Sequence, residues 1–296
     1  MRPDFLYIGP DKSGSTWLYE VLRRHPEVFV PSVKDLYFFD RNYDRGLVWY
    51  EKFFAAAPVT ARAVGELSHD YLFAPEAARR IRSDLPGVRL ITSLRDPADR
   101  TFSHYLYLRR SGITRAPFRD ALASHPELID NSRYSDHLAV YFDSFPRDRI
   151  RVLFFEDLVA DATAFAVKVF EFLGVSSAVD TVVGHPVLAA SRPRSFLLAH
   201  LAKRGANVAR TLGLPGLVGA VKGGVARRLL YVQYRPEDRP RLDPTDRARL
   251  IEVYREGVER LARLTGRDLE SWLLVERPAT AGAREADYAD TRVGGP

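Results

Sequence analysis

Short apolar segments alternate with helical patterns between residues 5 and 173, and this alternation constrains the fold more than any other feature of the sequence. The apolar segments are rich in Val, Ile, Leu and Phe, which is typical of strands buried on both faces of a sheet. Such strands, separated by helices, predict a parallel sheet flanked by helices, an α/β fold. The expected strands are residues 5–9, 63–67, 88–94 and 151–155, and the expected helices are residues 16–24, 75–83, 97–110, 134–145 and 161–173.

The chain after Gly174 has a different character. Residues 243–264 show the pattern of a surface helix that begins at a proline and ends near a glycine. From about residue 277 the sequence offers little to bury, which is typical of a mobile terminus. We therefore expect one α/β domain over residues 1–275 with a helical C-terminal portion, followed by a flexible tail over residues 276–296.

The composition excludes several classes of protein. Of the 296 residues, 46% are hydrophobic and 28% are charged, as in ordinary globular domains. The absence of cysteine excludes disulfide bonds, thiolate metal sites, iron–sulfur clusters and a cysteine nucleophile. No apolar run approaches the ~20 residues of a transmembrane helix, and the N-terminus lacks the pattern of a signal peptide. We therefore expect a soluble, cytoplasmic protein without a transmembrane segment.

The basic charge of the chain indicates an anionic ligand. The formal net charge is +6, and all but six of the 44 basic residues are Arg, a usage typical of GC-rich bacterial coding sequences. A basic chain can bind nucleic acid, a membrane surface or a small polyanion. Here the charges are spread along the sequence, and no nucleic-acid-binding motif accompanies them. The pattern therefore favours a small polyanion and predicts no nucleic acid partner.

A loop with glycine, lysine and hydroxyl residues joins the first expected strand to the first expected helix. Its sequence is Gly9-Pro-Asp-Lys12-Ser-Gly14-Ser15-Thr16. A helix N-terminus offers unpaired N–H groups to a phosphate, Gly14 allows close approach, and Lys12 supplies positive charge. The loop departs from the G-x-x-x-x-G-K-[ST] pattern of nucleoside triphosphate sites and is too short to wrap a β-phosphate with Mg²⁺. It predicts a phosphate site of another kind; the alternative is an ordinary strand-to-helix turn with a surface lysine.

A second basic motif follows the third expected strand. Arg95 stands at the strand end, and Asp96 before a proline is typical of a residue that caps a helix. Ser103 lies seven residues after Asp96, on about the same side of the helix. Arg95 and Ser103 can therefore hold a second phosphate from two directions, a task that suits the planar guanidinium of Arg. The alternative is that Arg95 pairs with Asp96 or Asp99 while Ser103 only packs.

Together these motifs resemble those of sulfotransferases that use 3′-phosphoadenosine 5′-phosphosulfate (PAPS), in the branch that includes heparan sulfate sulfotransferases and their bacterial relatives. The matching segments have a similar order and spacing, and the similarity spans most of residues 4–275. The resemblance implies a three-layer sandwich like that of P-loop nucleotide-binding proteins. The matching segments are Lys12-Ser-Gly-Ser-Thr16, Lys34-Asp-Leu-Tyr-Phe-Phe39, Gly46-Leu-Val-Trp-Tyr50, Arg95-Asp-Pro-x-x-Arg-x-x-Ser103-x-Tyr105 and Gly266-Arg-Asp-Leu-Glu-Ser-Trp272.

The resemblance also implies roles for individual residues. Lys12 would contact the bridging and sulfuryl oxygens of the donor, and Arg95 and Ser103 would bind its 3′-phosphate. The implied reaction is an in-line sulfuryl transfer that needs no metal and leaves adenosine 3′,5′-bisphosphate. The residues implied in donor binding are Lys12, Ser13, Gly14, Ser15, Thr16 and Trp17 in the loop, Arg95 and Ser103 in the second motif, and Ser191, Arg192 and Arg194 in a segment that closes over the nucleotide in relatives.

Transfer to a hydroxyl requires a general base, and three residues compete for this role. Asp35 stands where heparan-type relatives carry a catalytic Glu; the alternative is a surface ion pair between Asp35 and Lys34. His69 stands where cytosolic sulfotransferases place a catalytic His, and its ordinary pKa of about 6.5 suits proton abstraction. The alternative for His69 is a structural role, bonded to Asp70 or Glu66. Glu66 is itself the third candidate base.

Two other functions stay open from the sequence. One is a small-molecule kinase with a variant phosphate loop. The other is a non-catalytic anion- or glycan-binding relative, because Asp35 departs from the family's Glu and Leu67 from a second family lysine.

The implied acceptor is a hydroxyl of a carbohydrate or of a secondary metabolite. The aromatic residues of segment 37–54 are typical of a sugar-stacking wall or of a core. Residues 195–228 form a basic amphipathic pattern that would cover the acceptor, contact a partner or a membrane surface, or present a solvated helical face. The sequence assigns neither the acceptor nor the oligomeric state.

Overall fold

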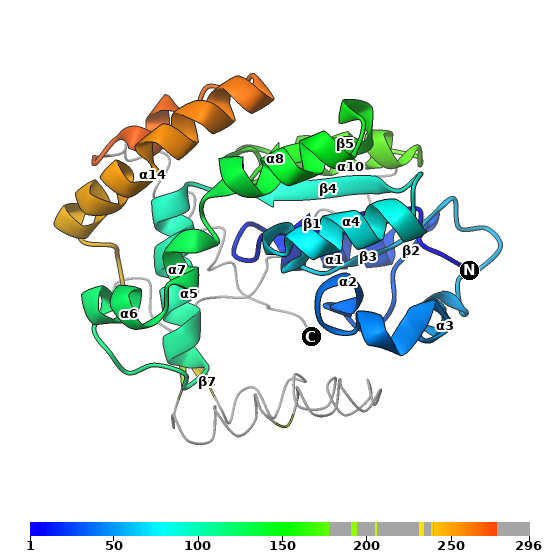
Figure 1. The fold of residues 1–296 in the computed structure, drawn as a ribbon, viewed down its shortest axis with the longest axis horizontal. Helices are drawn as coiled ribbons and strands as arrows, with labels where there is room; N and C mark the ends of the chain where they lie inside the picture. Colours follow the sequence, from blue (N-terminus) through cyan, green and yellow to red (C-terminus); the bar gives the residue numbers. More distant parts are fainter. Residues whose placement is uncertain (178–190, 194–204, 206–230, 234–237, 239, 277–296) are drawn as a thin grey trace, which may run out of the picture.

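A parallel sheet forms the centre of the computed structural model, which describes residues 1–177, 191–193, 205, 231–233, 238 and 240–276 (Figure 1). Its strands are β1 (Phe5–Gly9), β2 (Val28–Phe29), β3 (Ala63–Leu67), β4 (Arg89–Leu94) and β5 (Ile150–Phe154). They lie in the order β2-β3-β1-β4-β5, and each neighbouring pair is parallel. The expected α/β fold is therefore confirmed. The edge strand β2 was not expected, because two residues are too few to show a strand pattern.

Helices connect these strands. They are α1 (Ser15–Arg24), α2 (Phe38–Arg41), α3 (Gly46–Glu51), α4 (Pro75–Asp84), α5 (Pro97–Arg110), α6 (Phe118–Ser124), α7 (Glu127–Asp130), α8 (Tyr134–Ser144), α9 (Phe155–Ala160), α10 (Ala162–Leu173) and α14 (Pro244–Thr265). Single 3₁₀ turns lie at Tyr43–Arg45, Lys52–Phe54, Tyr71–Phe73, Arg147–Arg149 and Glu270–Leu273, and a small antiparallel pair joins β6 (Ser191–Pro193) to β7 (Tyr231–Gln233). The predicted cap is present, since the Asp96 carboxylate accepts from the N–H groups of Ala98 and Asp99 at the start of α5.

The sheet has an apolar cluster on each face. Alternate residues of β1 point to opposite sides, so Phe5 and Tyr7 join one cluster while Leu6 and Ile8 join the other. The first cluster contains residues of α1 and α10, and the second contains residues of α4, α8 and α14. The chain therefore forms the three layers, helix–sheet–helix, that the alternating pattern predicts.

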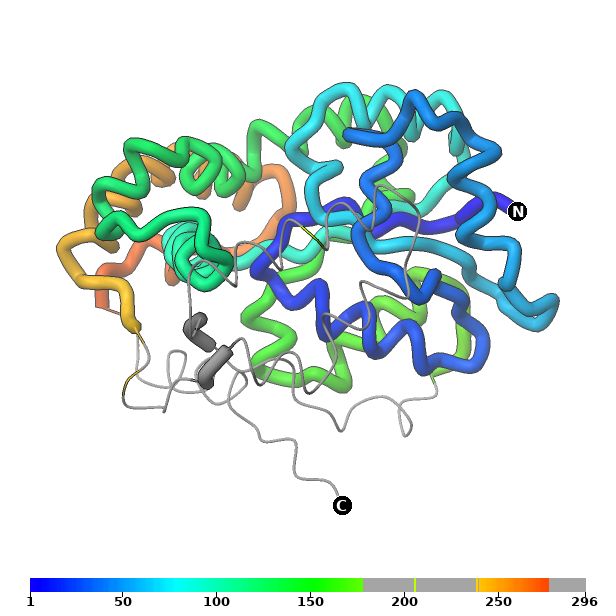
Figure 2. The backbone as a smooth tube through the Cα atoms, turned by 90° about the horizontal axis from the view of Figure 1, so that it is seen from below, coloured from blue at the N-terminus to red at the C-terminus, as the bar shows by residue number. Residues whose placement is uncertain are grey.

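The C-terminal helix α14 packs on α8 and α5, at the end of the molecule remote from the N-terminus (Figure 1). The view from below again shows α14 beside α8 and apart from the N-terminal strands (Figure 2). The buried guanidinium of Arg247 on α14 contacts Asp96 at 2.7 Å and Asp99 at 3.0 Å, which ties α14 to the start of α5.

Two of the sequence predictions concern segments of which the structure describes almost nothing. Of residues 195–228, only Gly205 is described, and the expected tail 276–296 lies outside the described residues apart from Glu276. Within the part of the chain that the structure describes, none of the helices combines the length and the apolar character that crossing a membrane requires.

The strand order brings three loops to one edge of the sheet. Strands β3, β1 and β4 are neighbours and all run in the same direction. Their carboxyl ends lead into His69, the loop 10–14 and Arg95, respectively. In open parallel sheets, ligands bind at this edge.

Candidate active site

Hydrogen bonds from β4 hold the loop after β1 in place. The hydroxyl of Thr92 donates to the carbonyl oxygen of Gly9, and that of Ser93 to the carbonyl oxygen of Ser13, each at 2.7 Å. The hydroxyl of Ser13, fully buried, donates to the carbonyl oxygen of Asp11 at 3.4 Å. With these carbonyl groups satisfied, the loop N–H groups are the atoms it can offer to an anion.

Two glycines allow this loop to pass close to other parts of the chain. Gly9 has φ +126°, and a Cβ there would lie 2.2 Å from the carbonyl oxygen of His69. Gly14 has φ +88°, and a Cβ there would lie 2.7 Å from the Leu158 side chain. Only glycine fits both the backbone conformation and the space, so these positions bring the loop against His69 and α9.

The N-terminus of α1 is open to a ligand. No side chain caps its first turn, which contains no acidic residue. The buried hydroxyl of Ser15 accepts a hydrogen bond from Lys34 Nζ at 2.8 Å, and Thr16 beside it is half-buried. The indole of Trp17 packs against Phe165 with ring centroids 5.8 Å apart, so it belongs to the core and Trp17 can offer a ligand only its backbone.

Lys12 lies within the loop in a strained, left-handed conformation with φ +64°. Its Nζ is 3.7 Å from the centroid of the Tyr107 ring and 3.7 Å from Asp11 Oδ2. Burial lowers the pKa of Lys12 to about 7, against the opposing effect of the Asp11 carboxylate. The cations that lower this pKa further are Arg110, Arg100 and Lys34.

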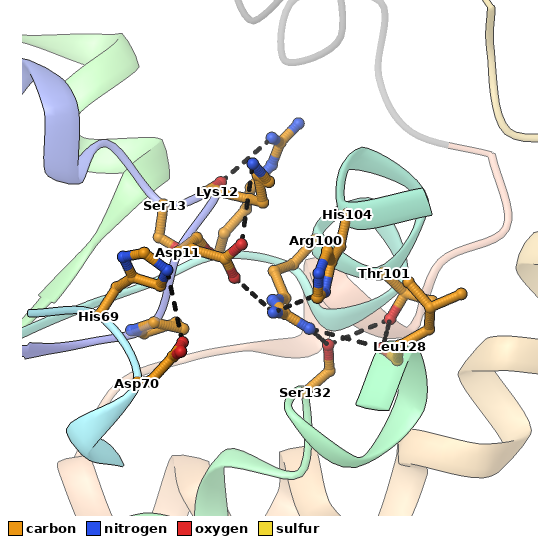
Figure 3. A network of polar contacts seen from close by, with 12 residues as sticks. Asp11, Lys12, Ser13, His69, Asp70, Arg100, Thr101, His104, Leu128 and Ser132 are labelled. Carbon is orange, nitrogen blue, oxygen red and sulfur yellow. Dashed lines mark hydrogen bonds and ion pairs between the residues drawn. The ribbon is translucent and has the colours of Figure 1, made fainter. Parts of the chain in front are cut away.

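A buried network of charged and polar groups lies beneath Lys12. Figure 3 shows Asp11 between Lys12 and Arg100, whose guanidinium is fully buried and binds the Asp11 carboxylate. Burial alone would raise the pKa of Asp11, but Arg100 with His104 and Lys12 holds it well below its usual range. His104 Nδ1 accepts from Arg100 at 3.1 Å, and burial lowers the pKa of His104 to about 3, so this imidazole is neutral.

The second phosphate motif, Arg95 with Ser103, follows β4, which neighbours β1 on the side opposite β3. Arg95 Nη1 donates to the carbonyl oxygen of Lys12 at 3.4 Å, and its guanidinium carbon is 4.8 Å from the Phe155 ring centroid. Ser103 is half-buried on α5. The acids that were the alternative partners of Arg95, Asp96 and Asp99, both bind Arg247.

The segment expected to close over a nucleotide begins beside this motif. The backbone of β6, which contains Ser191 and Arg192, packs next to α5. Arg194 lies outside the described residues.

The two rival candidates for the general base contact each other. His69 Nδ1 lies 2.7 Å from Asp35 Oδ1, although 34 positions separate them in the sequence. The contact arises because the backbone N–H of Asp35 donates to the carbonyl oxygen of Leu67 at 2.9 Å, which fixes the segment after β2 along the end of β3. Lys34, whose pairing with Asp35 was the alternative to a catalytic Asp35, bonds to Ser15.

The contacts of His69 define the tautomer that can act as a base. A carboxylate only accepts hydrogen bonds, and the contact of Nδ1 with Asp35 is the shorter of the two carboxylate contacts, so in the neutral imidazole Nδ1 carries the proton and Nε2 is the acceptor. Nε2 lies 3.1 Å from the Tyr37 hydroxyl and 3.4 Å from Asp70 Oδ1. Burial alone would lower the pKa of His69, but the charge and hydrogen bond of Asp35, with Asp70, raise it above 6.5.

Glu66, the third candidate base, is enclosed by hydroxyl groups. Its carboxylate accepts from Tyr50 at 3.0 Å, Tyr71 at 2.6 Å and Ser68 at 2.7 Å. The Ser68 hydroxyl in turn accepts from the backbone N–H of Tyr37. Burial raises the pKa of Glu66 to about 7, against the effect of the three hydroxyls. These contacts make Glu66 a support for the segment that carries Asp35.

Three residues of the site have a left-handed backbone without being glycine. Lys12, Asp35 and Tyr37 have φ values of 64°, 67° and 51°, and no other non-glycine residue in the described part of the chain has a positive φ. Strain of this kind is concentrated at functional sites, where the surrounding structure holds it. It marks Tyr37 as a site residue that the sequence analysis did not single out; its signals were its place two residues after Asp35 and its membership of the aromatic segment 37–54.

The aromatic segment 37–54 mostly fills the core. Phe38, Phe39, Tyr50 and Phe54 have 0% exposure, so the core interpretation is confirmed for them. Only Tyr37 of this group reaches the site. Among the described residues, no three His, Asp or Glu side chains are grouped so that they could hold a metal ion.

Comparison with known proteins gives a consistent result. Residues 2–205 match the sulfotransferase domain family. The chain is 32% identical over 194 residues to human bifunctional heparan sulfate N-deacetylase/N-sulfotransferase 3, an alignment that covers 58% of this chain and 22% of that protein. It is 29% identical over 275 residues to human heparan sulfate glucosamine 3-O-sulfotransferase 6, covering 90% of this chain and 72% of that protein.

The chain spans about a fifth to a third of the length of the bifunctional relatives it matches. A crystal structure of a sulfotransferase from Alicyclobacillus acidocaldarius superposes with a TM-score of 0.67 at 24% identity, covering 92% of this chain and 99% of that one, which shows a common fold. With a family match over more than half of its length, the chain belongs to the sulfotransferase domain family.

Proposed function

We propose that this protein transfers a sulfuryl group from PAPS to a hydroxyl of a carbohydrate or secondary-metabolite acceptor, and that residues 1–275 form the single domain that does so. One observation carries the proposal. The Lys12 loop follows β1, which lies between β4, followed by the basic motif of Arg95 and Ser103, and β3, followed by His69 with its hydrogen-bonded partner Asp35. The first arrangement suits a donor with two phosphate groups, and the second suits removal of a proton.

The residues of the site fit the donor. The open N-terminus of α1, with Lys12 and the hydroxyls of Ser15 and Thr16, suits the 5′-phosphosulfate. Arg95 and Ser103, which follow β4, would bind the 3′-phosphate. This phosphate is the group that distinguishes PAPS from ATP. The segment with Ser191, Arg192 and Arg194 would close over the nucleotide. The pKa of Lys12, lowered to about 7 by burial and by neighbouring cations, is what a site built to receive a polyanion produces.

The mechanism follows from the contacts of each side chain. PAPS supplies a sulfuryl group bonded to a phosphate, and adenosine 3′,5′-bisphosphate is the product. His69 Nε2 accepts the proton of the acceptor hydroxyl as that oxygen attacks in line. Asp35 keeps the proton of the imidazole on Nδ1 and stabilises the cation that forms. Lys12 and the N–H groups of α1 stabilise the negative charge that develops on the leaving phosphate.

The relatives favour a carbohydrate as the acceptor. Heparan sulfate glucosamine 3-O-sulfotransferase 6, by its name, acts on a hydroxyl of a sugar. In this chain Tyr37, with Arg41 4.2 Å from its ring centroid, lies against His69 and would line the path of such an acceptor. A planar ring beside the base is a surface on which a sugar can pack.

The binding test compares adenosine 3′,5′-bisphosphate with ADP, each with and without Mg²⁺, by thermal shift and calorimetry. We expect metal-independent binding of the bisphosphate. Arg95→Ala and Ser103→Ala should each weaken it, about tenfold or more for Arg95, because a hydrogen bond to a charged group is lost. Arg79→Ala and Ser124→Ala, at exposed positions, are the matched controls.

Other outcomes would decide against the proposal. A preference for ADP with Mg²⁺ would support a kinase. Bisphosphate binding without sulfated product from PAPS across a panel of sugar and phenolic acceptors would support a non-catalytic relative.

Donor binding should depend on pH through Lys12. Its pKa is about 7 in the free protein, and a bound polyanion favours the charged form and raises this pKa. Affinity for adenosine 3′,5′-bisphosphate should therefore fall as the pH rises from 7 to 9, by up to about tenfold per pH unit. Lys12→Arg, which stays charged, should bind with little change over that range. Calorimetry at several pH values checks this; equal slopes for the two proteins would contradict it.

A further inference from the structure

Lys34 approaches the donor loop from a separate part of the chain. Its Nζ donates to the hydroxyl of Ser15 at 2.8 Å, and Ser15, 5% exposed, is the first residue of α1. Lys34 belongs to the segment that follows β2, whereas Lys12 belongs to the loop that follows β1. Lys34 thus reaches the N-terminus of α1 from the β2 side of the sheet, across the intervening strand β3, whereas Lys12 lies in the loop that directly precedes α1.

The position of Lys34 in the chain places it between the loop and the base pair. Asp35, the next residue, is bonded to His69 and has φ +67°, a conformation that its backbone bond to Leu67 helps to hold. Consecutive side chains therefore serve different partners: Lys34 contacts the α1 N-terminus and Asp35 contacts the base.

The charges of the site indicate that Lys34 binds an anion. Leu67, at the end of β3, is 1% exposed and brings no charge. Lys34 is close enough to Lys12 to contribute to its lowered pKa. Two like charges in one site favour the binding of an anion, because the carboxylate beside Lys12, that of Asp11, is already paired with Arg100. Among the described residues, the hydrogen-bond partner of the Lys34 ammonium group is the Ser15 hydroxyl, a weak partner for a group that carries three donors.

We propose that Lys34 is a second donor-binding cation. When PAPS binds, the ammonium group of Lys34 gives up its hydrogen bond to the Ser15 hydroxyl, contacts the 5′-phosphosulfate and stabilises the sulfuryl group during transfer. This inference rests on the proposed function and adds a residue to it. Lys34 on the β2 side and Lys12 on the β1 side then hold the same anionic group from two directions. The end of β3 contributes no positive charge through Leu67. The segment after β2, the neighbour of β3 in the sheet, contributes the charge of Lys34.

The test measures binding of adenosine 3′,5′-bisphosphate by calorimetry in Lys34→Met and Lys34→Arg, with Lys52→Met as the matched control. Lys52 is exposed on a 3₁₀ turn, so its variant also loses one positive charge. Lys34→Met should weaken binding about tenfold or more, and Lys34→Arg should recover most of the loss. Lys52→Met should bind within about twofold of the unchanged protein, because an exposed charge is screened.

A second readout separates a role at the donor from a role in folding. Removing Lys34 removes one of the cations that lower the pKa of Lys12, so the pH at which bisphosphate binding begins to weaken should rise in Lys34→Met. A variant that binds weakly because it is misfolded would lose binding at every pH without moving that pH.

The outcomes distinguish this inference from the proposed function. Binding by Lys34→Met equal to that by Lys52→Met, with an unchanged pH dependence, would overturn the role of Lys34 and leave the proposed function intact. Failure of the unchanged protein to bind the bisphosphate would overturn the proposed function itself, and this inference with it.

Discussion

Replacing His69 by Ala should lower kcat by about 10²–10⁴-fold, because the transfer then lacks its general base. Binding of adenosine 3′,5′-bisphosphate should change little, since His69 lies on the acceptor side of the loop. The measurement is kcat at saturating PAPS, with the best acceptor found in the screen. His125→Ala is the matched control, because His125 bonds to Glu127 on α7 and lies outside the site. A kcat within threefold of the unchanged protein would contradict the role of His69.

Variants of Asp35 separate an orienting carboxylate from a base in its own right. In Asp35→Asn, the amide can donate to Nδ1, which moves the imidazole proton to Nε2 and removes the lone pair that accepts the substrate proton. We therefore expect Asp35→Asn to be as impaired as His69→Ala. Asp35→Ala leaves the tautomer free and should retain more activity than Asp35→Asn. Equal losses in the two Asp35 variants, with His69→Ala active, would make Asp35 itself the base.

The pH dependence of the rate gives an independent check of the pair. The imidazole must be neutral to act as a base, so kcat/KM rises as the pH passes the pKa of His69. Asp35 raises that pKa above 6.5 despite the effect of burial. Loss of the carboxylate in Asp35→Ala lowers the pKa, so the rise in rate should move to lower pH. An unmoved profile would show that Asp35 does not act on His69.

Replacing Asp11 by Ala should destabilise the protein by about 3–5 kcal/mol, because it leaves the guanidinium of Arg100 buried without its carboxylate. Arg100 has 0% exposure, and its other partners are neutral: His104, Ser132 and the carbonyl oxygen of Leu128. The free energy of unfolding from urea titration measures the effect. Asp143→Ala, at an exposed position on α8, is the control.

A second variant tests the reason for this loss. The double variant Asp11→Leu, Arg100→Met removes both charges and should be more stable than Asp11→Ala, since no unpaired charge stays buried. A loss below 1 kcal/mol in Asp11→Ala would mean that Arg100 finds water or another partner. Because the Asp11–Arg100 pair lies beneath Lys12, Asp11→Ala should also weaken bisphosphate binding.

Local chemistry allowed much of the fold to be predicted. The strands β1 and β3 are mostly apolar and the helix starts at Asp96 and Asp243 carry their own caps, so their bounds follow from short stretches of sequence. The edge strand β2 and the short helices α2, α3, α6, α7 and α9 were missed. The two residues of β2 are too few to show a period. The helix α9 begins directly after β5, so no loop residues mark its start.

Candidate site residues were easiest to propose where the motif is itself continuous. The Lys12 loop and the Arg95–Ser103 motif are each one run of the chain, so residue types and spacing could propose them as phosphate sites, and the family resemblance supplied the individual roles. Trp17 was grouped with the loop by adjacency, but the helical turn directs its indole into the core against Phe165. Glu66 was a candidate base because of its charge, and its three hydroxyl partners place it instead in a buried support.

The sequence by itself determined the α/β architecture and the phosphate-binding character of the first loop, because period, capping and glycine chemistry act within a few residues. It left Asp35 and His69 as alternative bases, and an ion pair between Lys34 and Asp35 as the alternative to a catalytic Asp35. The tertiary structure determined which of these contacts form, because it places the segment after β2 along the end of β3. That contact pairs Asp35 with His69 and turns Lys34 to α1. Pairing between strands depends on residues distant in the chain, and no local pattern records it.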